Sequence, residues 1–354
     1  MPKIFKDLDI FQLQWHLTAR CQMRCKHCYL YEDATYKSEI ENELDFDNCI
    51  SIMDDFINFC RLLKIRPAIS FTGGDPFLRE DFFDLLDEAK KRNILINILG
   101  NSFLLDEETV LRLKSYNLTY YQLSLDGMKQ KHDYFRKEGS FEDITRAIKL
   151  LKKHGIKTAV SMTLSKANSD DILPLMDYVG DLGVDIFTFA RFAPVGAGSD
   201  KKDWLMPANE YRELLIKIDE KIKEKNNLGI NTLYGKKCYL FSSLLNYEQG
   251  KLELPPKDDR IYFGCSLGIH GLIILANGVV QACRRLPSVV GKVPEQKLID
   301  IFIKSPEINE FRKVENLQKC SKCELLQVCR GCPAVSYGVY GDWTAPDPQC
   351  WKEI

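Results

Sequence analysis

The chain has 354 residues, of which 45% are hydrophobic and 28% charged, proportions typical of a globular protein with a sizeable core. Its 49 basic and 50 acidic side chains nearly cancel, so neither nucleic-acid binding nor attraction to an acidic membrane surface is predicted. The first ten residues lack the apolar segment of a secretion signal, and no apolar run approaches the length of a membrane span. A cytoplasmic location is expected.

The first two hundred residues alternate between strand-like and helix-like patterns. Strands are expected at 12–18, 68–72, 95–99, 120–125, 158–164 and 186–192, and helices at 47–63, 81–91, 106–115, 141–153 and 170–181. Six consecutive strand–helix units predict an α/β fold, either a doubly wound parallel sheet or an open partial barrel. Asp106 and Ser140 are expected to cap the N-termini of their helices, and Gly155 follows a helix as a C-terminal signal.

The pattern breaks after residue 192 at a Gly-rich run that marks a predicted domain boundary. An amphipathic helix is expected at 207–225, and a bridge rich in Lys, Asn and Pro follows it. Further on, Ala276-Asn277-Gly278 between apolar segments predicts a hairpin. Three regions result: residues 1–198 form the barrel, 199–264 the bridge and 265–354 a small cysteine-rich domain.

The 13 cysteines are the unusual feature of the composition. In a chain without a secretion signal, clustered cysteines favour metal binding or redox chemistry over a disulfide framework. Cys49 and Cys60 fall on the apolar face of a helical pattern and are expected to be small buried side chains. The clustered cysteines are Cys21, Cys25 and Cys28 near the N-terminus, and Cys265, Cys283, Cys320, Cys323, Cys329, Cys332 and Cys350 in the last quarter.

The first cluster reads CQMRCKHC at residues 21–28, directly after the first expected strand. Thiolates are the usual ligands of iron–sulfur clusters, so Cys21, Cys25 and Cys28 can hold three corners of a cubane. No fourth cysteine is nearby, which leaves one iron open to a small molecule. The alternative is a zinc site completed by His27 or by a distant residue.

This motif resembles the signature of the radical S-adenosylmethionine (SAM) superfamily, a CxxxCxxC loop after the first strand of a partial (β/α)6 TIM barrel. After the second strand, Gly73-Gly74-Asp75-Pro76 resembles the family's Gly-Gly-Glu-Pro, whose glycine backbone meets the amino group of SAM. Asp75 keeps the carboxylate on a shorter side chain. The resemblance further implies that polar residues at the end of the fourth strand and a downstream arginine contact the ribose or carboxylate of the cofactor.

The candidate contacts share a physical pattern that does not depend on the resemblance. Nearly all follow the C-terminal ends of expected strands, where barrels and open parallel sheets build their sites. For each polar side chain taken singly, a structural or solvated role is the alternative. The expected cofactor contacts are His27, Gly73, Gly74, Asp75, Asn101, Ser124, Asp126, Arg136, Thr163 and Arg191.

The resemblance implies a mechanism that acid–base side chains cannot perform, so the cofactor carries it. SAM would chelate the open iron, and one electron from the reduced cluster would cleave it to methionine and a 5′-deoxyadenosyl radical. That radical would abstract hydrogen from an unactivated C–H bond. A flavodoxin- or ferredoxin-like protein is the expected electron donor.

The tail resembles the SPASM extension of radical SAM enzymes, with a last Cys-x2-Cys one residue shorter than usual. The resemblance implies two auxiliary [4Fe–4S] clusters, three in all. The distal cluster would use Cys320, Cys323, Cys329 and Cys350, and the nearer one Cys265, Cys283 and Cys332. Cys238 is either the fourth ligand of the nearer cluster or a buried thiol. The alternative is a zinc ribbon made from Cys320, Cys323, Cys329 and Cys332.

Enzymes with such a tail mostly modify peptides or proteins, so the leading expectation is oxidative modification of a ribosomally made peptide by a crosslink, thioether or epimerisation. The alternative is oxidation or decarboxylation of a tetrapyrrole or small molecule. A passive electron carrier is the alternative of another class, but it would not need the cofactor residues at the strand ends. Arg284 stands where sulfatase-modifying relatives have aspartate, which disfavours that role.

The manner of substrate recognition is also constrained by the sequence. About ten residues precede the first expected strand, too few for a recognition domain. Leader recognition would then need a separate protein or the bridge at 199–264. Arg284 and Arg285 could meet an acidic group on the substrate or else line a surface turn. No catalytic base is apparent.

Overall fold

The computed structural model describes residues 9–31, 36–258 and 260–354. Its strands are β1 (Ile10–Thr18), β2 (Arg66–Gly73), β3 (Leu95–Leu99), β4 (Tyr120–Ser124), β5 (Thr158–Leu164), β6 (Ile186–Arg191), β7 (Leu233–Lys236), β8 (Leu272–Ile274), β9 (Val279–Gln281) and β10 (Val289–Lys292). The six predicted strands are confirmed as β1–β6.

The helices confirm the alternation expected from the sequence and add short ones near the tail. They are α1 (Tyr36–Glu41), α2 (Phe46–Leu63), α3 (Phe82–Lys91), α4 (Glu107–Lys114), α5 (Lys129–Phe135), α6 (Ser140–Lys153), α7 (Ile172–Asp181), α8 (Ala208–Asn227), α9 (Asn246–Glu248), α10 (Leu298–Lys304), α11 (Pro306–Phe311) and α12 (Pro333–Tyr340). Among the helices of the described ranges, none combines the length and apolar character needed to cross a membrane.

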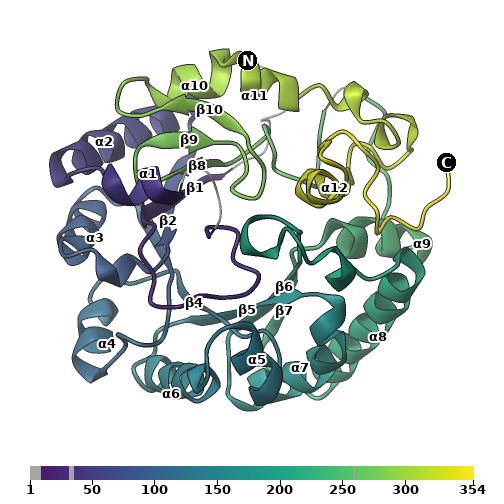
Figure 1. Cartoon of the computed structure of the whole chain (residues 1–354), viewed down its shortest axis with the longest axis horizontal. Helices are drawn as coiled ribbons and strands as arrows, with labels where there is room; N and C mark the ends of the chain where they lie inside the picture. Colours follow the sequence, from purple (N-terminus) through teal and green to yellow (C-terminus); the bar gives the residue numbers. More distant parts are fainter. Residues whose placement is uncertain (1–8, 32–35, 259) are drawn as a thin grey trace.

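The strands form one curved sheet in the order β10-β9-β8-β1-β2-β3-β4-β5-β6-β7. Strands β1 to β7 are parallel, β8 runs parallel to β1, and β9 and β10 complete an antiparallel edge. Figure 1 shows this sheet curving inside a ring of helices, with the tail closing toward the start of the chain. The predicted α/β class is confirmed, and the sheet continues into the predicted bridge through β7 and into the tail through β8.

Strand β1 explains why the inside of this curved sheet holds a cavity. Phe11, Leu13 and Trp15 are almost fully buried on the outer face, and the ring of Phe11 packs 4.7 Å from that of Phe59 on α2. Between them, Gln12 and Gln14 point to the opposite face, because side chains alternate along a strand. The apolar core therefore lies between sheet and helices, and polar side chains face the interior.

The ends of the helices test the expected caps. Asp106 accepts a hydrogen bond from the backbone N–H of Thr109 at 2.8 Å, as predicted. The prediction for Ser140 is wrong: α6 already includes Ser140, and Asp133 accepts from the N–H of Phe141 at 2.9 Å instead. Gly155 follows α6 with φ 72°, as expected.

The predicted features of the second half also appear. Gly278 takes φ 82° in the turn between β8 and β9, and Leu275 N–H donates to the carbonyl of Val279 at 2.8 Å. Cys49 and Cys60 are buried on α2, as their helical positions predicted.

Candidate functional site

The loop that follows β1 brings three cysteines to one cavity of about 270 Å³ at the C-terminal ends of the strands. Cys21 Sγ receives the backbone N–H of Met23 and the amide of Asn101, each at 3.4 Å. Arg136 Nη1 lies 3.8 Å from Cys25 Sγ. N–H donors aimed at sulfur stabilise the negative charge that thiolates carry in an iron–sulfur cluster. The residues therefore fit such a cluster.

The surroundings of these thiols favour a positively charged metal centre. Burial raises the pKa of Cys25 to about 12, with Arg136 opposing the shift, and burial also raises the pKa of Cys28. A metal centre supplies the positive charge that buried thiolates require. In the described part of the chain, no three His, Cys, Asp or Glu side chains are arranged to hold a single metal ion. A cubane imposes a different geometry, because each thiolate binds its own iron.

Gly73 and Gly74 let the end of β2 lie against the segment that leads into the cysteine loop. Gly73 has φ 138°, and a Cβ atom there would stand 2.0 Å from the carbonyl oxygen of Thr18. A Cβ on Gly74 would meet the carbonyl oxygen of Arg20 at the same distance. Only glycine permits so close an approach. Both glycines line the cavity, as expected for the predicted cofactor contacts.

Asp126 lies behind the cavity wall, where it holds the side chains that form that wall. It is fully buried, and its carboxylate accepts from Arg136 Nε at 2.5 Å and from the N–H of Thr163 at 2.8 Å. His27 Nε2 stands 3.3 Å from the same carboxylate. Burial opposes ionisation, but Arg136 and then His27 hold the pKa of Asp126 well below its usual range. Asp126 therefore positions Arg136 and His27.

Asp75 is also engaged within the protein rather than exposed to the cavity. Its carboxylate accepts from Gln22 Nε2 at 2.8 Å and from the N–H of Phe77 at 3.3 Å. Burial raises its pKa. A buried carboxylate needs hydrogen-bond donors, and these contacts supply them. A direct contact of Asp75 with the cofactor stays a prediction.

Arg191, at the end of β6, reaches the wall of the same cavity, but its guanidinium is committed to the tail. Nη1 and Nη2 contact the two carboxylate oxygens of Asp347 at 2.9 and 2.6 Å. Nη1 also contacts Gln349 Oε1 at 3.1 Å. Such a bidentate pair is among the strongest charge-assisted contacts. Arg191 therefore has a structural role in binding the tail, and its contact with the cofactor stays a prediction. The remaining predicted contacts line the cavity together with the three cysteines: His27, Gly73, Gly74, Asn101, Ser124, Arg136 and Thr163.

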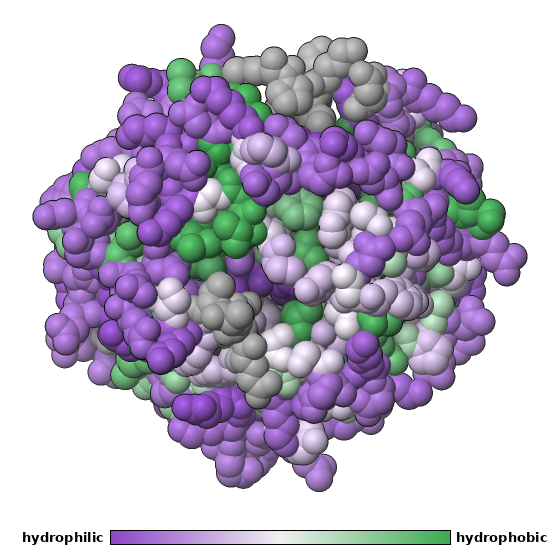
Figure 2. Space-filling view, turned by 45° about the horizontal axis from the view of Figure 1, so that its top comes forward, coloured by the Kyte–Doolittle hydropathy of each residue, from purple (hydrophilic) through white to green (hydrophobic). Residues whose placement is uncertain are grey.

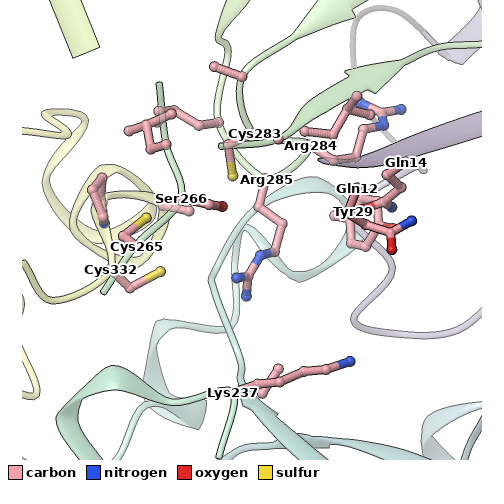
Figure 3. A pocket seen from close by; sticks show the side chains of 18 of the residues that line it. Gln12, Gln14, Tyr29, Lys237, Cys265, Ser266, Cys283, Arg284, Arg285 and Cys332 are labelled. Atoms are coloured by element: carbon pink, nitrogen blue, oxygen red, sulfur yellow. The ribbon is translucent and has the colours of Figure 1, made fainter. Parts of the chain in front are cut away.

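The tail cysteines divide between two further cavities. A cavity of about 530 Å³ is lined by Cys238, Cys265, Cys283 and Cys332, together with interior side chains of the sheet. Figure 3 shows Cys265, Cys283 and Cys332 directed toward its centre. A smaller cavity is lined by Cys320, Cys323, Cys329 and Cys350. These groupings coincide with the two ligand sets that the SPASM resemblance implied.

The large cavity and the first cysteine cavity share part of their walls. Tyr29, Gln122, Arg191 and Arg285 line both. Figure 2 shows this face of the molecule hollowed near its centre. A molecule bound in the large cavity would therefore reach the cavity of the first three cysteines.

Both cavities are lined by basic side chains and by no described Asp or Glu. The large cavity includes Arg191, Lys237, Arg284 and Arg285, and the first includes Arg136, Arg191 and Arg285. The sequence drew attention to the arginines but missed Lys237, Tyr29 and the glutamines. The alternation of Gln12 and Gln14 with buried apolar residues is a signal that could have revealed the glutamines. Lys237 has no local signal.

Comparison with known proteins identifies the two halves of the site. Residues 15–179 match the Radical SAM superfamily, and residues 265–333 match SPASM, an iron–sulfur cluster-binding domain. The chain therefore contains a radical SAM domain. It also carries a SPASM domain after it, and together these imply iron–sulfur clusters and binding of SAM.

The names of similar proteins point to two kinds of substrate. The AdoMet-dependent heme synthase of Nitratidesulfovibrio vulgaris is 28% identical over 346 residues, which cover 96% of this chain and 91% of that protein. Mycofactocin maturase MftC of Mycolicibacterium smegmatis is 24% identical, with 96% and 82% covered. The crystal structure of Streptococcus suis SuiB bound to precursor peptide SuiA matches with TM-score 0.73 and 19% identity, covering 92% of this chain and 72% of that one. The structural likeness confirms the radical SAM–SPASM fold.

Proposed function

We propose that this chain is a radical SAM enzyme with three [4Fe–4S] clusters that oxidises a substrate carrying carboxylate groups, with a tetrapyrrole as the first candidate. The observation that carries the proposal is the 530 Å³ cavity beside the tail cysteines, whose lining includes four Lys or Arg side chains, among them Lys237 and Arg285, but no described acidic residue. Cations in a partly enclosed cavity attract anionic ligands.

The first cavity would hold the radical-generating cluster on Cys21, Cys25 and Cys28. When bound there, cluster and SAM supply a 5′-deoxyadenosyl radical that abstracts hydrogen from the substrate. The polypeptide binds and orients the cofactor through Gly73 and Gly74, Asn101, Ser124 and Thr163 at the strand ends. Asp126 keeps Arg136 and His27 turned toward the cysteine loop.

The tail would hold the two auxiliary clusters. Cys320, Cys323, Cys329 and Cys350 surround one cavity and are proposed to ligate the distal cluster. Cys265, Cys283 and Cys332 are proposed to ligate the nearer one. Cys238 is the proposed fourth ligand, because it lines the same cavity as those three. The nearer cluster would then lie next to the substrate, where it can accept the electron that oxidation releases.

A tetrapyrrole is favoured by two independent observations. The first is charge, since propionate side chains of porphyrins are anions that Lys and Arg bind well. The second is likeness over the full length: the Fe-coproporphyrin III synthase of Methanosarcina barkeri is 28% identical, covering 95% of this chain and 86% of that protein. The proposed reaction is oxidation or decarboxylation of a porphyrin side chain.

Oxidative modification of a ribosomally made peptide is the second candidate. It is supported by peptide-modifying relatives, among them the subtilosin biosynthesis protein AlbA of Bacillus subtilis, which is 25% identical over 329 residues. An acidic peptide side chain would suit the same cations. A separate leader-recognition protein would be its partner. Both candidates require an electron donor, for which a flavodoxin- or ferredoxin-like protein is proposed.

The test is anaerobic turnover of the reduced, reconstituted protein with SAM. We expect release of 5′-deoxyadenosine and consumption of iron coproporphyrin III. Mass spectrometry measures both compounds. Cys25→Ala should abolish 5′-deoxyadenosine release while the absorbance of the auxiliary clusters persists. Turnover of a precursor peptide, without turnover of the porphyrin, would favour the second candidate. Intact SAM in the presence of fully reduced clusters would instead indicate a passive electron carrier.

A further inference from the structure

Four Lys or Arg side chains line the large cavity, and they differ in what holds them. Arg191 pairs with Asp347, and Arg284 Nη2 contacts Glu39 Oε1 at 2.7 Å in a buried ion pair with α1. Carboxylates of the protein therefore offset the charges of these two arginines. They belong to the framework of the cavity.

Among the described residues, the hydrogen bonds of Lys237 and Arg285 go to neutral oxygen atoms. Lys237 Nζ donates to the side-chain oxygen of Gln122 on β4 at 3.0 Å. Arg285 Nη1 donates to the backbone carbonyl of Arg191 at 3.1 Å. Neither side chain forms an ion pair with a carboxylate among the residues that the structure describes. No carboxylate of the described residues therefore offsets either charge, although the sulfur atoms of Cys332, Cys283 and Cys265 lie close enough to Arg285 to favour its charged form.

The two side chains approach the same space from different parts of the chain. Lys237 follows β7, and Arg285 comes from the loop that holds Cys283. Figure 3 shows the guanidinium of Arg285 extending into the cavity between the cysteines and Lys237. Two like charges held near each other are stabilised by an anion between or beside them.

We infer that Lys237 and Arg285 form a carboxylate-binding subsite that anchors the substrate in the large cavity. Arg285 also lines the cavity of Cys21, Cys25 and Cys28, so a substrate anchored there extends toward the site of hydrogen abstraction. The inference rests on the proposed function, because it assumes a substrate with carboxylate groups. The ligand class is a porphyrin carrying propionate side chains.

The experiment compares the same porphyrin with and without its charges. Iron coproporphyrin III and its tetramethyl ester are titrated into the anaerobic holoprotein, with binding followed by the absorbance of the porphyrin. The wild type should bind the acid more tightly than the ester. Lys237→Met and Arg285→Met should each weaken binding of the acid by about 10- to 100-fold, as expected for loss of one charged hydrogen bond, and leave binding of the ester unchanged.

Matched variants separate charge from side-chain shape. Arg285→Lys and Lys237→Arg keep the charge and should restore most of the affinity. Lys304→Met on α10, whose side chain is 75% exposed, removes a lysine far from the cavity lining and should bind the acid like the wild type. Arg285→Met could lose the absorbance of its clusters. In that case the affinity of Lys237→Met for the acid, and the comparison of acid with ester in the wild type, still test the subsite.

The outcomes distinguish the subsite from the function on which it rests. Equal binding of acid and ester by the wild type, or unchanged affinity in Lys237→Met, would overturn the subsite while porphyrin turnover could still stand. A wild type that binds neither compound would overturn the tetrapyrrole function and the subsite with it.

Discussion

Arg191 and Asp347 form a buried bidentate ion pair that ties the end of β6 to the segment between Cys332 and Cys350. The two side chains are 5% and 2% exposed. Asp347 also accepts the backbone N–H of Cys332 at 2.8 Å and that of Gln349 at 3.0 Å. One carboxylate thus fixes a cysteine of the large cavity to the barrel and lies in the wall of the smaller cysteine cavity.

Breaking this pair should destabilise the protein strongly. Arg191→Met leaves Asp347 buried and without its cation, so the free energy of unfolding should fall by about 3–5 kcal/mol. The double variant Arg191→Met with Asp347→Asn should lose less than the sum of the single variants, because the uncompensated charge is gone. Anaerobic thermal unfolding measures both. Lys304→Met, which breaks an exposed pair with Asp300, is the control and should cost less than about 1 kcal/mol. A melting temperature for Arg191→Met equal to that of this control would contradict the prediction.

Cys238 should behave as a cluster ligand rather than as a buried thiol. Its Sγ lies 3.0 Å from the hydroxyl of Tyr211, a contact that would suit a ligating thiolate. Cys238→Ala should change the electron paramagnetic resonance spectrum of the nearer auxiliary cluster and lower the iron content per chain. Cys60→Ala, which removes a buried thiol on α2, should change neither. Identical spectra for Cys238→Ala and the wild type would show that Cys238 is not the fourth ligand of the nearer cluster.

Gly73→Ala should disrupt the first cysteine loop. A methyl group at residue 73 would stand 2.0 Å from the carbonyl oxygen of Thr18, so the backbone before Cys21 must move. We expect loss of the iron at the first site and at least a 100-fold drop in 5′-deoxyadenosine release, because displaced binding groups cost about that much. Gly229→Ala is the matched control: it also has positive φ, at 69°, but a Cβ atom there meets nothing within 4 Å. It should cost about 1 kcal/mol of stability and keep activity. Full activity of Gly73→Ala would contradict the close packing.

Stability should fall as the pH drops from about 6.5 toward 4. His132 is buried, and its Nδ1 accepts the backbone N–H of Asp126 at 3.1 Å, a role that requires the neutral ring. Burial, and then the charge of Arg136, lower its pKa to about 4, against roughly 6.5 in the unfolded chain. The unfolded state therefore binds the proton first. The stabilisation is complete above about pH 6.5, falls progressively below it, and is fully lost once the pH has passed below the folded pKa near 4.

The size of this effect follows from the shift. At pH 5 it amounts to about 2 kcal/mol, which urea unfolding at pH 7 and pH 5 can measure. His132→Gln should flatten the pH dependence. Part of it should persist, because burial also lowers the pKa of His16 well below its usual value. A slope that is the same in the variant and the wild type would show that His132 does not contribute.

Local spacing was enough to predict the first cysteine constellation and the strand ends around it. The loop at 21–28 is a short-range pattern, because ligands of one cluster on one loop must be close in sequence. The tail cysteines are spread over residues 265–350, and their grouping came from the SPASM resemblance. Likewise, the alternation of six strands and helices predicted a parallel sheet, whose C-terminal edge collects the residues that follow each strand.

Only the tertiary structure decided which long-range partners those residues take. Arg191 was predicted from its place at a strand end, but Asp347, 156 residues away, binds its guanidinium. Lys237 and Arg285 meet in one cavity because Lys237 follows β7 at one edge of the sheet and Arg285 lies between β9 and β10 at the other. Such pairings depend on how the tail packs against the barrel. No local pattern of residues encodes that packing, so the sequence determined the chemistry of the cysteine sites and the fold determined which charges surround them.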